Sequence, residues 1–233
     1  MCPPVTRSVN GPSSARPVTR RYTVYVDVRR AVLVACCLLV MVRPLHAAEQ
    51  PLLVCFGDSI TAGYGLSDQQ AYPVFLQKLL DAHGYRYKVV NEGTSGATTK
   101  DALAELPFVL HMHPAVVIVE FGGNDGLRGL PVSQTRDNLD QLLTRLEQAH
   151  VKILLAGITL PPDYGEDYIR SFDAIFRDLA AKHHDAVVPM IYKNLVNVPG
   201  TIQSDGIHPT AKGSAIIAET IFPALKPLLR RQP

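Results

Sequence analysis

The sequence predicts a doubly wound α/β fold, in which helices cover both faces of a mainly parallel sheet. From residue 51 onward, short apolar runs alternate with longer amphipathic stretches, and strand–helix alternation of this kind is typical of that class. Three of the apolar runs hold almost no polar residue, as strands buried on both faces of a parallel sheet do. Each motif whose side chains could take part in a reaction also falls on a loop after such a run, where ligands bind in open α/β sheets.

Strands and helices are expected in strict alternation. The strand candidates are Leu52–Phe56, Tyr87–Val90, Ala115–Glu120, Lys152–Gly157 and Ala186–Met190. The helix candidates are Tyr72–His83, Thr98–His111, Val132–His150, Asp167–His184 and Ala211–Leu229. The 132–150 segment has the clearest helical periodicity, with a stripe formed by Val132, Leu139, Leu142, Leu143 and Leu146.

The composition suits one globular domain and argues against a nucleic-acid partner. The chain has 233 residues, of which 47% are hydrophobic and 19% are charged, so it is long enough for one full core. Residues 1–47 contain seven arginines and one acid, whereas the remainder carries 16 basic and 20 acidic residues, a net charge of −4. Nucleic-acid binding would need a basic face on the folded part, and this mildly acidic body does not supply one.

Residues 29–48 have the pattern of a secretory signal peptide. Arg29 and Arg30 precede twelve uncharged residues, 31–42, which are too few to span a bilayer, and small residues at 47 and 48 offer a cleavage point. The alternatives are a buried core helix, an uncleaved membrane anchor and a lipoprotein cleavage box at Cys36. We therefore expect an exported, periplasmic protein, with secretion outside the cell as the other fate.

The segments on either side of this signal complete the expected organisation. Residues 1–28 are rich in Pro, Ser and Arg without apolar periodicity, and we expect a non-native or disordered extension, with translation starting near Val26 or Val28. Residues 49–233 are expected to form a single domain. Cys55 is the one cysteine after the leader, so we expect no internal disulfide, and its apolar surroundings indicate a small buried core residue.

The first loop, Phe56–Gly65, offers Ser59 as a nucleophile. It reads FGDSITAGYG, and a serine just past a buried strand can point its hydroxyl up from the edge of the sheet. Thr61 stands where the G-x-S-x-G elbow has its second glycine, and no Gly-Lys-Ser/Thr ends the loop, so neither that elbow nor a phosphate-binding loop is present. Taken alone, the serine could equally be a turn or helix-cap residue.

The last loop places an acid three residues before a histidine, as Asp205-Gly-Ile-His208. A carboxylate at this spacing can reach the imidazole within a tight turn, fix its tautomer and hold the ring towards a hydroxyl, as the acyl-transfer triad requires. His111 and His113 could suggest a metal pair, but no acid or cysteine cluster accompanies them. The neighbouring pair at 183–184 closes a helix, where a cation suits the helix dipole. No metal site is expected.

Two middle loops supply donors for a tetrahedral oxyanion. The loop Asn91–Gly96 follows the second strand and contains Gly93, whose small size leaves backbone N–H groups exposed. The loop Gly122–Gly126 follows the third strand and offers the side-chain amide of Asn124. Donors held in place where negative charge develops are worth roughly 3–4 kcal/mol each in such reactions. The alternative is that these residues only build turns.

Taken together and in order, these four blocks resemble the GDSL/SGNH hydrolases. The resemblance spans nearly the whole chain after the leader, and Ile60 replaces the leucine of the name-giving motif. It implies a three-layer α/β/α, flavodoxin-like fold with a five-stranded parallel sheet and no metal or cofactor. It also implies that Ser59 is the nucleophile, His208 the base and then the acid, and Asp205 its partner. Ser59 N–H, Gly93 N–H and the Asn124 side chain would form the oxyanion hole.

A narrower resemblance concerns the substrate. The runs 119–131, 160–168 and 204–209 are similar to the periplasmic acyl-CoA thioesterase/lysophospholipase/arylesterase group of Gram-negative bacteria. In that group the stretch matching Gly126–Pro131 moves over the acyl chain. This implies an acyl groove lined by Gly126, Leu127, Leu130 and Leu160.

The expected function is therefore hydrolysis of a small-molecule ester, thioester or lysolipid by a monomer without a stable protein partner. A carbohydrate acetylesterase on the same fold is an alternative, because the motif blocks serve that chemistry equally well. A catalytically silent binding protein and a flavodoxin-like cofactor binder are the others. An intact triad argues against the silent protein.

Overall fold

The computed structural model describes residues 50–195 and 197–231. The predicted extension, 1–28, and the predicted signal peptide, 29–48, lie outside the described residues. The assignment of residues 49–233 to one domain stays a prediction.

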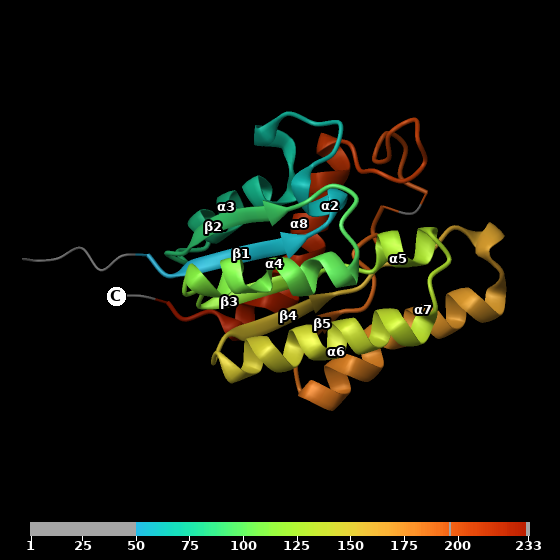
Figure 1. Ribbon diagram of the computed structural model, residues 1–233. Helices are drawn as coiled ribbons and strands as arrows, with labels where there is room; N and C mark the ends of the chain where they lie inside the picture. The colour runs from blue at the N-terminus through green and yellow to red at the C-terminus, as the bar shows by residue number, and fades with distance from the viewer. Residues whose placement is uncertain (1–49, 196, 232–233) are drawn as a thin grey trace, which may run out of the picture. The chain divides into compact units, whose positions relative to one another are not determined.

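One parallel sheet of five strands forms the centre of the described part (Figure 1). Its strands are β1 (Leu52–Gly57), β2 (Lys88–Gly93), β3 (Val116–Glu120), β4 (Lys152–Ala156) and β5 (Ala186–Val188). Their order is β2-β1-β3-β4-β5, which confirms the predicted flavodoxin-like sheet. The chain leaves β1 towards one edge and returns to pair β3 on its other side, so the topological switch point lies at the carboxyl ends of β1 and β3.

Burial explains why the strand predictions succeeded. Every residue of β3 is buried, and β1 and β4 are buried except at their first residues, as expected for central strands with helices on both faces. Strand β2 lies at an edge, and its residues are only partly covered. Its polar sequence therefore gives the weakest strand signal.

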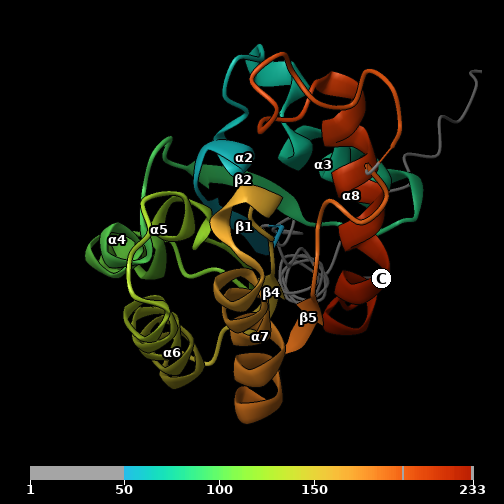
Figure 2. The same ribbon diagram turned by 90° about the vertical axis from the view of Figure 1, so that its right-hand side faces the viewer.

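Helices pack on both faces of the sheet, which gives the three layers (Figure 2). The helices are α2 (Ser59–Ala62), α3 (Tyr72–Ala82), α4 (Thr99–His111), α5 (Gly123–Leu127), α6 (Val132–Gln148), α7 (Glu166–His183) and α8 (Ala211–Leu225). Helices α3 and α8 cover one face, and α4, α6 and α7 cover the other. Three short 3₁₀ helices among the described residues occupy Asp68–Gln70, Pro162–Tyr164 and Lys226–Leu228.

Three local differences from the sequence prediction have clear causes. The loops after β1 and β3 each begin with a short helix, because Asp58 caps α2 with its side chain and Gly122 turns the chain at φ 113° before α5. The last helix ends at Leu225 instead of Leu229. Its final turn tightens into a 3₁₀ helix that contains Pro227, whose ring supplies no N–H for an α-helical hydrogen bond.

His183, the last residue of α7, fastens this helix to α6. Its Nε2 lies 2.6 Å from an oxygen of Asp140, and its Nδ1 lies 3.1 Å from an oxygen of Glu147. Both ring nitrogens face carboxylates, and only the imidazolium form can donate to both of them. Burial of the ring opposes its charge, but the hydrogen bonds to the two carboxylates outweigh this and raise its pKa.

Replacing His183 by glutamine is expected to lower the free energy of unfolding by about 1–3 kcal/mol near pH 6, because two charge-assisted hydrogen bonds are lost. The pKa is raised in the folded protein, so the contribution is complete below the unfolded value of about 6.5 and disappears as the pH rises through the folded value. Urea unfolding at a series of pH values measures the difference. The exposed neighbour His184, changed to asparagine, is the control, and a pH-independent difference would contradict the assignment.

Candidate active site

The nucleophile turn, which we define as residues 58–62, lies directly after β1, at the switch point of the sheet. Ser59 is the first residue of α2, and Asp58 caps this helix by accepting the N–H of Ile60 on Oδ1 at 3.0 Å. Gly57 is required here because a Cβ at this position would lie 2.1 Å from Thr61 Oγ1 and 2.7 Å from the carbonyl oxygen of Glu120. The glycine therefore lets α2 turn sharply back over the end of the sheet.

The structure brings together Ser59, His208 and Asp205, although 149 residues separate the serine from the histidine. The Oγ of Ser59 lies 2.9 Å from Nε2 of His208, and Nδ1 of His208 lies 2.7 Å from Oδ2 of Asp205. These contacts link a hydroxyl, an imidazole and a carboxylate in series. Such a chain is suited to removing the hydroxyl proton as the oxygen attacks a carbonyl group.

Asp205 is held as a carboxylate. Its Oδ1 accepts the backbone N–H groups of Ile207 at 2.9 Å and His208 at 3.0 Å. The N–H of Ile207 is the main reason that the pKa of Asp205 falls to about 2, with further contributions from the N–H and imidazole of His208 that exceed the opposing effect of burial. Asp205 is therefore negatively charged throughout the neutral range.

The hairpin Thr201–Thr210, which carries Asp205 and His208, is closed at its base. The N–H of Thr210 donates to Thr201 O at 2.8 Å, and the N–H of Gln203 donates to His208 O at 2.8 Å. Between these bonds, Ile202 and Pro209 form an isolated antiparallel bridge. The acid and the histidine thus belong to one hydrogen-bonded unit.

Three residues that the sequence analysis did not single out connect this hairpin to the rest of the site. Gln203 Nε2 donates to the carbonyl oxygens of Tyr64 and Pro209 at 2.8 and 2.9 Å, so it joins the segment after α2 to the hairpin. The ring of Tyr64 lies 4.5 Å from the His208 ring, centroid to centroid. Tyr192 donates its hydroxyl to Ile207 O at 2.8 Å. These are tertiary contacts, and no local sequence pattern marks them.

Gly93 does not fit its predicted role as an oxyanion donor. Its N–H donates to Asn91 Oδ1 at 3.0 Å, so this donor is already in use at the end of β2. Within the described ranges, the N–H groups of Ser59, Ser95 and Gly96 have no hydrogen-bond acceptor in the protein, and Gly96 adopts φ 83°. The loop after β2 therefore offers its free N–H groups two or three residues later than the sequence suggested.

The role of Gly93 is close packing against α2. A Cβ at this position would lie 2.1 Å from the backbone nitrogen of Ala62, so Gly93→Ala should shift α2 and lower the free energy of unfolding by about 3 kcal/mol. Urea titration measures the loss. Gly84→Ala is the control, because its Cβ would meet nothing within 4 Å and only the left-handed backbone costs about 1 kcal/mol. Equal losses in the two variants would refute the packing role.

Asn124 lies in the first turn of α5 and connects three segments of the site. Its Nδ2 donates to Asp58 Oδ2 at 3.1 Å and to Ala97 O at 3.0 Å, so its amide touches the nucleophile turn and the loop after β2. The neighbouring Asp125 is buried and accepts the N–H and hydroxyl of Thr99 at 2.9 and 2.5 Å. Asp125 thereby fixes α5 to the start of α4, while Asn124 faces the site.

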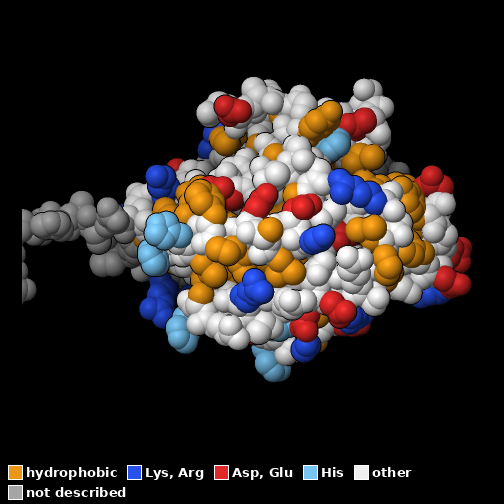
Figure 3. Space-filling model, viewed as in Figure 1, with side chains coloured by type: hydrophobic (Ala, Val, Ile, Leu, Met, Phe, Trp, Pro, Cys, Tyr) orange, Lys and Arg blue, Asp and Glu red, His pale blue; other side chains and the backbone are white. Residues whose placement is uncertain are grey.

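An apolar cavity of about 260 Å³ opens next to Gly123 and Ile207, which directly precede Asn124 and His208 in the sequence. It is lined by Gly123, Leu127, Ile158, Thr159, Leu160, Pro161, Pro162, Tyr192, Gly206 and Ile207. Figure 3 shows apolar side chains gathered over the same end of the molecule, where α5 and the start of α7 lie.

Two of the four residues predicted for an acyl groove line this cavity, and two do not. Leu127 and Leu160 are in its wall. Gly126 is buried beneath Leu160, where a Cβ would lie 2.4 Å from a methyl carbon of that leucine. Leu130 lies past the end of α5 and is absent from the lining, and its carbonyl oxygen accepts the hydroxyl of Tyr168 at 2.7 Å.

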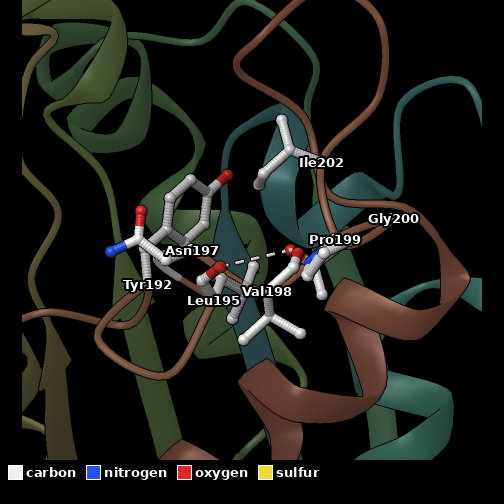
Figure 4. A pocket seen from close by; sticks show the side chains of 8 residues that line it. Tyr192, Leu195, Asn197, Val198, Pro199, Gly200 and Ile202 are labelled. Carbon is white, nitrogen blue, oxygen red and sulfur yellow. Dashed lines mark hydrogen bonds between the residues drawn. The ribbon is translucent and has the colours of Figure 1, made fainter.

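A second cavity of about 410 Å³ has Tyr192 in its wall (Figure 4). The rest of its described wall comes from the segment before the hairpin, with Leu195, Val198 and Pro199, and from the start of the hairpin at Ile202. Tyr192 belongs to the lining of both cavities.

In the part of the chain that the structure describes, no group of three or more His, Cys, Asp or Glu side chains is arranged to hold a metal ion. The same described residues include no helix with the length and apolar character needed to cross a membrane. The rings of His111 and His113 lie 6.2 Å apart at the end of α4.

Comparisons with known proteins agree with this architecture. The model of the GDSL-like Lipase/Acylhydrolase family matches residues 55–216, a range that contains Ser59 and His208. Esterase TesA of Pseudomonas aeruginosa is 42% identical over 201 residues, which are 86% of this chain and 100% of that protein. Thioesterase 1/protease 1/lysophospholipase L1 of Escherichia coli K12 is 37% identical over 193 residues, 82% of this chain and 91% of the relative. The crystal structure of TesA has a TM-score of 0.73 at 43% identity and covers 77% of this chain and 100% of its own.

Proposed function

The chain belongs to the GDSL-like lipase/acylhydrolase family, and from that premise we propose that it is a serine hydrolase that cleaves carboxylic esters and thioesters through an acyl-enzyme on Ser59. One observation carries this proposal: the hydrogen-bonded series Ser59–His208–Asp205 at the carboxyl end of the sheet. Two similar proteins are named as an esterase and as a thioesterase and lysophospholipase, which supports the same reaction class.

The reaction takes place in two acyl transfers. Ser59 Oγ attacks the carbonyl carbon while His208 Nε2 takes its proton, and Asp205 stabilises the imidazolium that forms. The tetrahedral intermediate then breaks its bond to the alcohol or thiol, which leaves with the proton from His208. Water attacks the acyl-enzyme in the same way, giving its proton to His208, and the free acid leaves as Ser59 regains a proton.

The oxyanion would be stabilised by donors from three segments. The N–H of Ser59 and an N–H from Ser95 or Gly96 are free for this purpose among the described residues, whereas the N–H of Gly93 donates to Asn91 Oδ1. The amide of Asn124 lies beside them, but its two protons point to Asp58 and Ala97 in the free protein. Donation to the oxyanion would therefore require one of those bonds to be shared or exchanged.

The direct test of the nucleophile is labelling with a fluorophosphonate, which phosphonylates activated serines, followed by mass spectrometry of the peptides. We expect the label on Ser59 and loss of esterase activity in proportion to labelling. Activity that survives complete labelling, or a label on another serine, would contradict the assignment.

We propose that the apolar cavity of about 260 Å³ next to Gly123 and Ile207 accepts the acyl chain. Its wall is apolar on both sides, with Leu127 from α5 and Leu160 and Ile158 from the segment after β4. Such a surface favours an alkyl chain over a hydroxylated sugar. The expected substrates are therefore medium-chain or longer acyl esters and thioesters rather than acetylated carbohydrates.

Replacing Leu127 by tryptophan should fill this cavity and shorten the accepted chain. With p-nitrophenyl esters from acetate to palmitate, we expect kcat/KM to fall about tenfold or more for octanoate and longer chains, and to change little for acetate. Leu130→Trp is the matched control, because Leu130 does not line the cavity. Equal effects on all chain lengths, or an activity of the parent protein confined to acetate, would move the proposal to an acetylesterase.

We further propose that the protein is exported to the periplasm through a signal peptide in residues 29–48. The support is the basic, apolar and small-residue order of that segment. Mass spectrometry of the amino terminus in a periplasmic fraction tests this. We expect a mature chain that begins near residue 48 or 49, and a full-length chain in the cytoplasm would refute it.

A further inference from the structure

Two buried carboxyl groups, one at the start of the nucleophile turn and one at the end of the neighbouring strand β3, are not used by the reaction described above. Asp58 precedes Ser59 and is 2% exposed, whereas Glu120 ends β3 and is fully buried. The side chains of these two residues are within hydrogen-bonding contact. Among the described residues, neither carboxyl group forms a salt bridge with Lys, Arg or His.

The contacts of Asp58 are those of a carboxylate. Its Oδ1 accepts the N–H of Ile60 at 3.0 Å, and its Oδ2 accepts Nδ2 of Asn124 at 3.1 Å. Each oxygen therefore has an N–H donor. Through these two bonds Asp58 sets both the start of α2, where Ser59 lies, and the position of the Asn124 amide.

The contacts of Glu120 are those of a carboxylic acid. Its Oε2 accepts the hydroxyl of Thr61 at 2.8 Å, but its Oε1 has no N–H or O–H donor within the described ranges. A buried carboxylate with a bare oxygen beside a second carboxylate is strongly unfavourable, so the pair must hold a proton. Glu120 has the oxygen without a donor. A proton on Glu120 therefore turns the contact between the side chains of Glu120 and Asp58 into a hydrogen bond.

The electrostatic surroundings agree with this assignment. Burial and then the charge of Asp58 raise the pKa of Glu120 well above its ordinary value, whereas for Asp58 burial is opposed by the hydrogen bonds from Ile60 and Asn124, which lower its pKa. The other titratable groups that interact with the pair are Cys55 on β1, Tyr72 on α3, Tyr192 and His208. The pKa of Cys55 is raised to about 12 and that of Tyr72 is also raised, so both are neutral at pH 7.

We propose that Glu120 is a positioning residue for the hydrolysis. Glu120 keeps its proton at neutral pH and donates a hydrogen bond to the carboxylate of Asp58, and this bond holds Ser59 and Asn124 in their relative positions. The proposal rests on the function of Ser59 given above. Its physical consequence is that the pair carries one negative charge instead of two. A second charge beneath the site would oppose the negative charge that develops on the substrate oxygen.

The first test compares Glu120→Gln with Glu120→Met. Glutamine can donate to Asp58 and accept from Thr61 without a charge, so kcat should stay within about threefold of the parent value. Methionine has a similar volume but can do neither, and kcat should fall about 10- to 100-fold with little change in KM, as expected from small displacements of reacting groups. Ser214→Ala, a change of a buried hydroxyl on α8, controls for general effects of core substitution.

Fluorophosphonate titration of Ser59 counts the competent sites in each variant, so that rates refer to folded enzyme. A methionine variant with the parent kcat, or a glutamine variant as impaired as the methionine one, would overturn the proposal. Loss of all activity with retention of labelling at Ser59 in both variants would also overturn it. Full activity in Ser59→Ala would instead refute the proposed function, so the two failures are distinguishable.

The second test does not depend on activity or on the methionine variant folding. Infrared spectroscopy of the parent protein at neutral pH should contain the C=O stretch of a protonated carboxyl group. The band should shift when glutamate side chains carry ¹³C, and it should be absent from Glu120→Gln. A band that shifts with ¹³C-labelled aspartate instead, or no such band, would refute a proton on Glu120.

Discussion

An alanine at position 59 is expected to lower kcat about ten-thousand-fold or more while leaving the free energy of unfolding close to that of the parent protein. Ser59 Oγ is the group that would form the acyl bond, and without it His208 has no hydroxyl to deprotonate. The remaining donors can still polarise a bound carbonyl group, so a small activity above the uncatalysed rate should persist. The measurement is hydrolysis of p-nitrophenyl octanoate together with urea unfolding.

Ser171→Ala is the matched control, since Ser171 is a serine on the exposed side of α7 whose hydroxyl donates to Asp167 O. It should keep the parent rate. A folded Ser59→Ala protein with most of its activity would mean that another group attacks the substrate. The proposed function would then have to be given up, whatever the geometry of His208 and Asp205.

Asp205→Asn should produce the second largest loss, about a thousand- to ten-thousand-fold in kcat. The asparagine can still accept the N–H groups of Ile207 and His208 on Oδ1, so the hairpin should keep its shape. Its amide nitrogen, however, would face Nδ1 of His208, where the carboxylate now accepts at 2.7 Å. Two N–H groups cannot face each other, so the ring is driven to the tautomer that cannot take the proton of Ser59.

The pH dependence makes this prediction more specific. The pKa of Asp205 is lowered to about 2, so the carboxylate stabilises the folded state above its unfolded pKa of about 3.9, and this contribution is lost as the pH falls through 2. The loss of kcat in Asp205→Asn should therefore be nearly constant from pH 6 to pH 9. The control is Asp163→Asn on an exposed 3₁₀ helix. A deficit that vanishes anywhere in this range would contradict the proposed role of Asp205.

The sheet and the main helices could be predicted because their signals are local. Runs such as 116–120 and 152–156 are apolar since both faces of the sheet are covered, and the stripe on α6 repeats with the turn of the helix. The two short helices could not be predicted in this way. They are too short for a periodic pattern, and they depend on a side-chain cap at Asp58 and a left-handed turn at Gly122.

The residues of the site also fall into those that a sequence pattern predicts and those that depend on tertiary contacts. Motif order was enough to suggest Ser59, Asn124, Asp205 and His208, because family resemblance preserves the sequence of the loops. It was not enough to choose the glycine, because the bond from Gly93 to Asn91 depends on the geometry of the strand end. Gln203 contacts Tyr64 across 139 residues, so no local pattern could reveal it. Glu120 did leave a signal, an acid at the end of an apolar strand, but it was interpreted only as the strand boundary.

Because the hairpin Thr201–Thr210 is closed at its base, the distance from Asp205 to His208 and the distance from His208 to Ser59 are set by different contacts. Within the hairpin, the distance from Asp205 to His208 is fixed by bonds that all lie inside the same ten-residue unit. Between the hairpin and the sheet, the approach of His208 to Ser59 is set by outside contacts such as those of Gln203 and Tyr192. A tilt of the whole hairpin would therefore lengthen the histidine–serine bond while leaving the acid–histidine bond unchanged. The orientation of His208 relative to Asp205 therefore does not depend on the contacts that place the hairpin against Ser59.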